Sequence, residues 1–402
     1  MIPFSPPRID QEVVEEVSKA LLSGWITTGP RTKKFETELT NYTGCKKTIC
    51  LSSATAGLEL ILRWYGVKAG DEVIIPAYTY CATANVIMHC GAKPVMVDIN
   101  EKDFNISVQA IKNAITPNTK VIMPVDISGF TCDFDEINAL VNKSEIKTMF
   151  KASSDNQKKL GRILVMADSA HSIGATMNGK QSGNLTDVSV FSFHAVKNLT
   201  TAEGGAICMN FPEQFDCDEI YKDLNRMSLH GQSKDALAKT QVGNWRYDVL
   251  EAGYKCNMTD IQAAIGLVEL GRYESNLKRR KEIFNQYVEG FRTNNWAIIP
   301  PYKEDGKETS YHLFLLRIKQ IDEPTRDAIM QKIFAAGVSV NVHFQPLPLL
   351  TVYKNEGYKM SDYPVAWSKY ENEITLPAYF DLTNKQVEFI IKTVINAVES
   401  TI

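Results

Sequence analysis

The sequence has no apolar run close to the roughly 18 residues that a membrane-spanning helix needs. Its first residues also lack the charged-then-apolar layout of a secretion signal. The formal net charge is only -3 over 402 residues, so there is no basic field to attract nucleic acid or anionic lipid. The eight cysteines are scattered and form no CxxC pair, which argues against zinc and disulfides. We therefore expect a cytoplasmic protein with reduced thiols that binds no metal, nucleic acid or membrane.

Short apolar segments alternate with amphipathic helical patterns over the first part of the chain. The apolar segments lie at 72–76, 93–99, 120–127, 162–170, 188–193 and 205–210. Near-continuous apolar strands of this kind are typical of a sheet that helices cover on both faces. The pattern predicts an α/β fold with a mostly parallel central sheet flanked by helices. The polar, lysine-rich stretch at 143–161 is interpreted as a surface insertion with a short helix.

The last part of the chain has a different pattern. A long helical pattern at 259–294 is predicted to lead out of the first region. The segments at 311–318 and 337–344 are interpreted as short strands, and a final helix follows them. We predict two domains: an N-terminal segment and large domain over residues 1–258, and a linking helix with a smaller C-terminal α/β domain over residues 259–402.

Polar side chains gather where predicted strands end, which is where open α/β sheets bind ligands. Asp168 ends the strand ILVMAD, and VFSF leads to Ser192 and Lys197. Taken alone, Asp168 is equally a helix cap or a metal ligand, and Lys197 is a solvated loop lysine. No second carboxylate at a suitable spacing supports a metal. Upstream, Ser53–Thr55 begin a helix, where free N–H groups and hydroxyls can hold a phosphate or form an ordinary cap.

Together these residues fit pyridoxal phosphate. That cofactor needs an anion cradle, a carboxylate that keeps its pyridine nitrogen protonated, a flat group against its ring, and a lysine amine that bonds to its aldehyde. Ser53–Thr55 with Ser192 can supply the cradle, and Asp168 the carboxylate. Tyr80, after the strand EVIIP, can stack on the ring, and Lys197 can supply the amine.

The order of the motifs resembles the DegT/StrS family of nucleotide-sugar aminotransferases. From about residue 20 to 380 they read SGWITTGPRTKKFETEL, SSATAGLEL, PAYTYCATANVIMHCGAKPVMVDI, ADSAHSIGA, FSFHAVKNLTTAEGGAI, GYKCNMTDIQAAIGLVEL and VNVHFQPLPLL. The resemblance implies the fold type I architecture of PLP-dependent transferases. It also implies a homodimer with active sites at the subunit interface.

By position, the resemblance implies roles for individual residues. Lys197 would bond to the cofactor, and Asp168 would pair with its pyridine nitrogen. His171, which alone would more often be structural, would contact the ring hydroxyl. The phosphate would be bound by Ala54, Thr55 and Ser192.

The sequence departs from the family pattern at two places. Many members carry Asn in a GYN motif that reaches the neighbouring subunit's phosphate, whereas this chain has GYKCN. Either Lys255 or Asn257 would take that role, unless both lie on a solvated turn. Asp126, in PVDISGF, stands where many members have a histidine.

The resemblance also implies the reaction. We expect glutamate to donate an amino group to the keto carbon of a nucleotide-linked sugar, at C4 of a 4-keto-6-deoxyhexose rather than C3. Thr27 and Thr28 are candidate substrate contacts, with a simple connector as the alternative. His343 is a candidate contact from the small domain, or else a packed strand-end histidine.

Other functions within the wider fold remain open. A catalytically idle PLP-binding regulator would not need Lys197. A PLP-dependent sugar dehydratase would carry histidine at the position of Lys197. An amino-acid aminotransferase would need an arginine clamp for a second carboxylate, and no segment clearly supplies one.

Overall fold

The computed structural model describes residues 1–233, 246–304 and 306–402. Its centre is a 7-stranded sheet in the order β1-β9-β8-β5-β4-β2-β3. The strands from β8 to β3 run parallel to one another, whereas β9 is antiparallel to its two neighbours, β1 and β8. The strands are β1 (Lys47–Leu51), β2 (Glu72–Pro76), β3 (Lys93–Val97), β4 (Thr119–Ile122), β5 (Leu164–Asp168), β8 (Val188–Ser192) and β9 (Gly205–Met209). The predicted α/β fold with a mostly parallel sheet is confirmed, although β1 was not predicted.

Helices cover both faces of this sheet. Alternate residues of each strand point to opposite faces, so a strand that is apolar throughout presents apolar side chains on both sides, and the helices bury them. In β5, Leu164 and Met166 join one core, while Val165 and Ala167 join another. The helices of the first face are α3 (Ala54–Trp64), α4 (Cys81–His89), α8 (Asp155–Leu160) and α9 (Cys217–Ser228). The opposite face is covered by α2 (Pro30–Thr43), α5 (Val108–Ala114), α6 (Phe134–Val141), α7 (Ser144–Met149) and α11 (Asp260–Gly271). The segment 143–161 thus holds two short helices rather than one.

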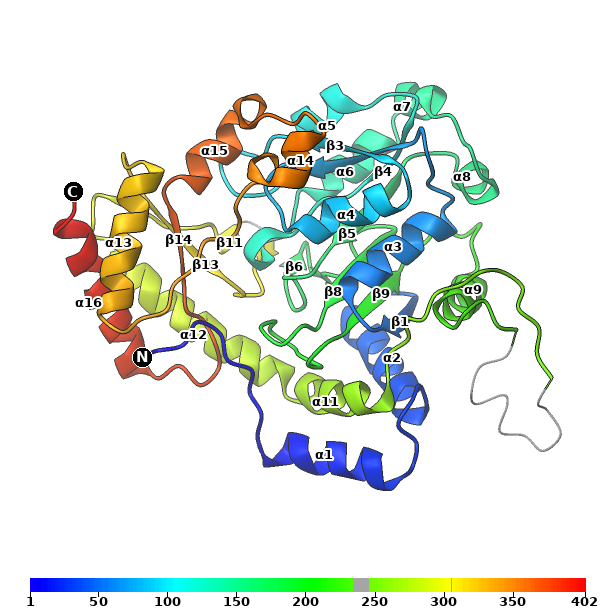
Figure 1. Ribbon diagram of the computed structural model, residues 1–402, viewed down its shortest axis with the longest axis horizontal. Helices are drawn as coiled ribbons and strands as arrows, with labels where there is room; N and C mark the ends of the chain where they lie inside the picture. Colours follow the sequence, from blue (N-terminus) through cyan, green and yellow to red (C-terminus); the bar gives the residue numbers. More distant parts are fainter. Residues whose placement is uncertain (234–245, 305) are drawn as a thin grey trace.

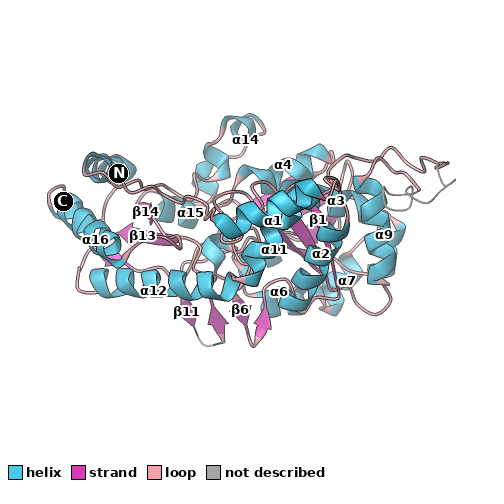
Figure 2. Cartoon of the chain, turned by 90° about the horizontal axis from the view of Figure 1, so that it is seen from below, coloured by secondary structure: helices cyan, strands magenta, loops and turns pink. Residues whose placement is uncertain are grey.

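The helical pattern at 259–294 forms two helices. Thr259 caps α11 through a capping box with Gln262, and α12 (Tyr273–Phe291) begins after a break at Arg272. Gly271, a poor helix former, precedes the break. α1 (Gln11–Leu22) packs against α11. Figure 2 shows α12 running from α11 towards α16 (Asn384–Glu399) at the C-terminal end.

A smaller antiparallel sheet lies at the other end of the molecule (Figure 1). Its order is β10 (Ala297–Ile298), β13 (Phe314–Ile318) and β14 (Glu373–Leu376). This sheet shares a core with α12, α13 (Glu323–Ala335) and α16. The predicted strand at 311–318 is therefore present as β13. The predicted strand at 337–344 is wrong, because this segment makes only isolated bridges.

Further short elements connect the two parts of the molecule. A 4-stranded sheet joins residues from both, in the order β11 (Lys303–Glu304), β12 (Lys307–Glu308), β6 (Thr176–Met177) and β7 (Lys180–Gln181). Between β13 and β14, α14 (Thr351–Asn355) and α15 (Pro364–Tyr370) pack on the core of the large sheet. The domain boundary at 258/259 stays a prediction. Within the described ranges, no helix combines the length and the apolarity needed to cross a bilayer.

Candidate active site

A cavity of about 460 Å³ lies where β5 and β8 end. These neighbouring parallel strands place Asp168 at the end of one and Ser192 at the end of the other. The predicted site residues that line the cavity are Ser53, Ala54, Thr55, Tyr80, Asp168, His171, Ser192, Lys197 and His343. Thr27, Thr28, Lys255 and Asn257 do not line it. The residues predicted from the sequence therefore fall into one group that lines this cavity and a second group outside it.

The start of α3 forms one wall of the cavity. Ser53 is the N-cap, and its Oγ accepts a hydrogen bond of 3.0 Å from the N–H of Ala56. The first N–H groups of a helix have no intrahelical acceptor, so those at Ala54 and Thr55 can bind an anion. β9 passes against this start so closely that a Cβ on Gly205 would lie 2.4 Å from the Ala54 nitrogen. Only glycine fits there.

Asp168 is held in place by two donors. Thr83 Oγ1 donates to its Oδ2 at 2.8 Å, and the Ala170 N–H donates to its Oδ1 at 3.3 Å. Burial raises the pKa of the Asp168 carboxyl, and both hydrogen bonds together with the Lys197 charge oppose that rise. A cation beside the carboxylate, such as a protonated pyridine nitrogen, would offset the remaining desolvation.

The amine of Lys197 has a lower pKa than an ordinary lysine. Burial lowers the pKa of Lys197 to about 8, and the Asp168 carboxylate works in the opposite direction. The amine is therefore partly neutral at mildly alkaline pH, which is the form that attacks a carbonyl. The loop lysine of the sequence is thus a half-buried amine in the wall of the cavity.

His171 carries an unpaired atom inside this cavity. Its Nδ1 is buried and has no hydrogen-bond partner within the described residues. Burial, followed by the charges of Lys197 and His343, lowers the pKa of His171 well below its ordinary value, so the ring is neutral. An unpaired buried nitrogen is costly unless a ligand supplies its partner. The ring hydroxyl of pyridoxal phosphate is such a partner, so the donor set fits the cofactor.

The cavity also contains residues that the sequence does not predict as site residues, among them His312 and Phe4. His312 lies with its ring 4.5 Å from that of His171, and its Nδ1 is 2.8 Å from Asn198 Oδ1. Phe4 stacks on His343 with ring centroids 5.4 Å apart. His312 lies just before β13 and Phe4 belongs to the N-terminal segment, so both reach the cavity only through the tertiary fold. The sequence around His312 predicts only a strand, at 311–318.

Asp126 lies behind the cavity rather than in its wall. Its Oδ2 accepts hydrogen bonds from Ser172 Oγ at 2.7 Å and from Ser169 Oγ at 3.2 Å. Its backbone N–H donates to the carbonyl of Asp168 at 3.2 Å. The aspartate therefore braces the 168–172 turn that carries Asp168 and His171.

The other predicted residues form a separate cluster. Asn257 Nδ2 donates to Thr28 Oγ1 at 2.6 Å, and Lys255 Nζ donates to Asn257 Oδ1. The carbonyl of Thr27 accepts from the Asp260 N–H at 3.0 Å. The cluster lies next to the end of β1, where the Ser52 N–H donates to the Cys256 carbonyl at 2.7 Å. Lys255 and Thr27 are exposed.

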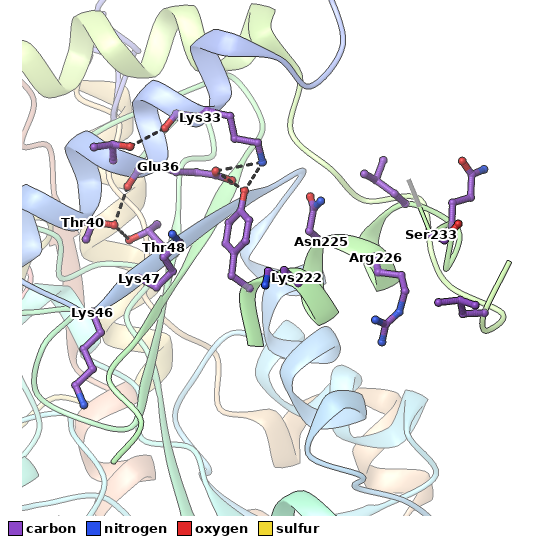
Figure 3. A pocket seen from close by; sticks show the side chains of 15 residues that line it. Lys33, Glu36, Thr40, Lys46, Lys47, Thr48, Lys222, Asn225, Arg226 and Ser233 are labelled. Atoms are coloured by element: carbon purple, nitrogen blue, oxygen red, sulfur yellow. Dashed lines mark hydrogen bonds and ion pairs between the residues drawn. The ribbon is translucent and has the colours of Figure 1, made fainter. Parts of the chain in front are cut away.

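A larger cavity of about 710 Å³ lies elsewhere, between α2 and α9 (Figure 3). Although it is rich in lysine, several of its cations are already paired. Lys33 contacts Glu36, Lys47 lies 2.7 Å from Asp218, and Arg226 lies 2.9 Å from Glu251. None of the predicted site residues lines it, and we therefore assign the chemistry to the smaller cavity.

Comparison with known proteins identifies the family. The sequence matches the DegT/DnrJ/EryC1/StrS aminotransferase family over residues 7–395. The chain belongs to this family. It is 41% identical over 397 residues to the uncharacterized protein MJ1066 of Methanocaldococcus jannaschii, covering 98% of this chain and 96% of that protein. It is 34% identical over 400 residues to the spore coat polysaccharide biosynthesis protein SpsC of Bacillus subtilis, with the same two coverages.

Solved structures agree with this membership. Spr1654 of Streptococcus pneumoniae, assigned as a sugar aminotransferase and solved in its PMP form, has a TM-score of 0.97 and 48% identity over 100% of both chains. Its PLP form has a TM-score of 0.95 and 46% identity, covering 100% of this chain and 99% of that one. PseC of Helicobacter pylori, an aminotransferase of pseudoaminic acid biosynthesis, has a TM-score of 0.85 and 26% identity over 99% of both. The predicted cofactor, pyridoxal phosphate, and the transferase fold are confirmed.

Proposed function

We propose that this aminotransferase moves an amino group from glutamate to the keto carbon of a nucleotide-linked sugar. The observation that carries the proposal is a single cavity holding Lys197, Asp168 and the open helix start at Ser53–Thr55. The names of SpsC, Spr1654 and PseC, which refer to polysaccharide or sugar chemistry, support a sugar acceptor. Free cysteines at all eight positions fit a reducing cytoplasm.

Within this proposal, pyridoxal phosphate supplies an electron sink for the charge left when a proton leaves the donor carbon. Lys197 would hold the cofactor through its amine, and as a free base it would take the proton from the donor Cα and, in the second half-reaction, deliver a proton to the acceptor carbon. Asp168 holds a proton at the pyridine nitrogen. Ser53–Thr55 and Ser192 bind the phosphate, and His171 pairs with the ring hydroxyl.

The acceptor is proposed to be a 4-keto-6-deoxyhexose aminated at C4. The aromatic walls of the cavity support a sugar, because Tyr80 and Phe344 lie 5.9 Å apart and Phe4 stacks on His343. Tyr80 exposes 60% of its surface at the rim and can cover a bound ring. His343 is the proposed contact from the small domain.

We propose further that a second copy of the chain completes each site. Thr27, Thr28, Lys255 and Asn257 cluster outside the cavity of their own chain, with polar atoms near an exposed surface. Ile26, beside them, exposes 51% of its surface although it is apolar. In a two-fold dimer each subunit can lend this cluster to its partner's cofactor phosphate and sugar.

Three measurements test the proposal. Lys197→Ala should still bind cofactor but lose turnover, and full activity in this variant would remove the lysine from the mechanism. Glutamate added to the wild type should convert the yellow absorbance to that of the pyridoxamine form. An unchanged spectrum would favour the idle regulator or another donor. A panel of 4-keto and 3-keto nucleotide sugars decides the position, and use of 3-keto sugars alone would overturn the C4 assignment.

A further inference from the structure

His343 is connected to a buried carboxyl through a single hydroxyl. Its Nδ1 lies 3.0 Å from Thr375 Oγ1, and Thr375 Oγ1 donates to Glu373 Oε1 at 2.6 Å. The other carboxylate oxygen, Oε2, accepts the backbone N–H of His343 at 3.1 Å. Glu373 and Thr375 are both fully buried in β14. This short chain of hydrogen bonds ends on a ring that lines the cavity.

The histidine ring carries only one proton. Burial, together with the Lys197 charge, lowers the pKa of His343 to about 3, so the ring is neutral at working pH. In a neutral imidazole one nitrogen donates and the other accepts, and the hydrogen bond at one decides the state of the other. The partner of Nδ1 therefore decides what Nε2 offers.

A hydroxyl has one proton to give, so Thr375 cannot donate to both neighbours. With Glu373 ionised, Thr375 donates to the carboxylate and must accept from Nδ1–H, which leaves Nε2 as an acceptor. With Glu373 protonated, the proton goes on Oε1, because Thr375 is an available acceptor there whereas Oε2 faces the His343 N–H donor. Thr375 then donates to Nδ1, and Nε2 carries the proton.

We propose that Glu373, acting through Thr375, decides which ring nitrogen of His343 is protonated, and hence whether His343 offers the substrate an acceptor or a donor. Glu373 and Thr375 are positioning residues that act on the substrate only through His343. The consequence for sugar binding rests on the proposed function, whereas the tautomer itself does not.

The surroundings of Glu373 allow its charge to change near working pH. Arg317 stands opposite it on β13, Arg326 of α13 donates to its backbone carbonyl at 3.4 Å, and Tyr78 lies close enough to interact with its charge. Burial is the dominant effect and raises the pKa of Glu373 to about 8, although both arginines oppose it.

The test is to read the tautomer directly in the PLP-loaded enzyme. The chain has only six histidines, so nitrogen-15 histidine labelling gives a simple two-bond proton–nitrogen NMR spectrum, and the His343→Gln spectrum assigns the resonance. Between about pH 6 and about pH 9.5, we expect His343 to change from the Nε2–H to the Nδ1–H tautomer, with its midpoint near the pKa of Glu373. A single tautomer over the whole range would overturn the proposal.

Three variants distinguish this hydrogen-bonded relay, which runs from Glu373 through Thr375 to His343, from a purely structural role of these residues. In Glu373→Gln the amide oxygen must accept the His343 N–H, so its NH2 group faces Thr375 and locks His343 as Nε2–H at every pH. Thr375→Ser should keep the transition and Thr375→Val should lose it. A transition that persists in the folded Glu373→Gln or Thr375→Val protein would contradict the relay, and retained thermal unfolding midpoints establish folding. If the enzyme then failed to aminate any nucleotide sugar, the proposed function would fall while the NMR result stood.

A kinetic readout connects the tautomer to the substrate. In the wild type, the KM for the sugar should change by about tenfold across this pH range, because a lost hydrogen bond costs about 1.4 kcal/mol. Glu373→Gln should remove that dependence. An equal pH dependence of the sugar KM in both proteins would exclude His343 as the contact that the relay controls.

Discussion

Asp168, at the end of β5, and Lys197, in the loop after the neighbouring strand β8, line one cavity. Burial lowers the pKa of Lys197, and the Asp168 carboxylate raises it. The same pair acts in reverse, because Lys197 lowers the pKa of the buried Asp168. The two groups are therefore electrostatically coupled before any ligand arrives. Because of this coupling, removing the charge of one group changes the pKa of the other, and that change can be measured.

The first prediction concerns Lys197 in the cofactor-free protein. Covalent attachment of pyridoxal phosphate should accelerate as pH rises through about 8 and then level off, because only the neutral amine attacks. In Asp168→Asn the midpoint should move lower, since the carboxylate no longer holds the lysine proton. Stopped-flow absorbance measures the rate. A midpoint above about 10, as for a free lysine, would contradict the buried environment.

The second prediction concerns Asp168. Asp168→Asn should lower kcat/KM by at least about 100-fold, since a neutral amide no longer holds a proton at the pyridine nitrogen. Thr83→Val is the matched control, because it removes the 2.8 Å hydrogen bond and leaves the carboxylate. Steady-state kinetics should rank the wild type first, Thr83→Val second and Asp168→Asn last. An Asp168→Asn protein as active as the wild type would remove the carboxylate from the mechanism.

The third prediction concerns the helix start. Ser53→Ala should weaken cofactor binding, measured by fluorescence titration, and cost roughly 1 kcal/mol of stability through the lost cap. Ser107→Ala provides the control, because Ser107 caps α5 in the same way outside the cavity. Both variants should lose similar stability, but only Ser53→Ala should bind cofactor less tightly. If both variants bound the cofactor equally tightly, Ser53 would be an ordinary helix cap without a role in cofactor binding.

The fourth prediction concerns Asp126 and pH. Burial raises the pKa of Asp126 to about 6, above its unfolded value of roughly 3.9. Its contribution to stability is therefore fully present below about pH 4 and is lost as pH rises to about 6. Relative to the wild type, Asp126→Asn should gain on the order of 2–3 kcal/mol across that window. Unfolding of both proteins at matched pH measures the difference, and a constant difference would show that Asp126 does not titrate there.

The fifth prediction concerns the shared site. A Lys197→Ala chain and a chain with Lys255→Ala and Asn257→Ala are each expected to be nearly inactive. If the cluster serves the partner's cavity, each mixed dimer has one site with both defects and one with neither, so co-refolding should restore activity. Activity that fails to reappear, despite mixed dimers in native mass spectra, would place each site within one chain.

The sequence identified the residues at strand ends because short motifs bring them together locally. Asp168 is the last residue of β5 and Lys197 lies in the loop that follows β8, so their placement needs only the rule for open sheets. His312 and Phe4 carry no such signal, because His312 lies just before β13 and Phe4 lies in the N-terminal segment, both far from these strand ends in the sequence. Their approach to His171 and His343 is a product of the tertiary fold.

Some helices and strands of the structure differ from those predicted from the sequence, and the reasons are local. β1 is short and begins with Lys47 and Thr48, so its apolar run is too brief to recognise. The segment 337–344 has the composition of a strand, but only Val338 and Asn341 form bridges to other backbone segments. The break at Arg272 follows Gly271 and is fixed by the bonds of Arg272 to Glu269 and Asp10. The spacing of apolar residues along the sequence does not reveal such bonding partners.

The most direct test of the central claim follows the nitrogen atom itself. The PLP-loaded enzyme is incubated with nitrogen-15 glutamate and a nucleotide-linked 4-keto-6-deoxyhexose, and the sugar is analysed by mass spectrometry. We predict a labelled amino group at C4 in the wild type and none with Lys197→Ala. A sugar that gains no label from glutamate, in a protein whose cofactor absorbance shows that it is loaded, would contradict the account.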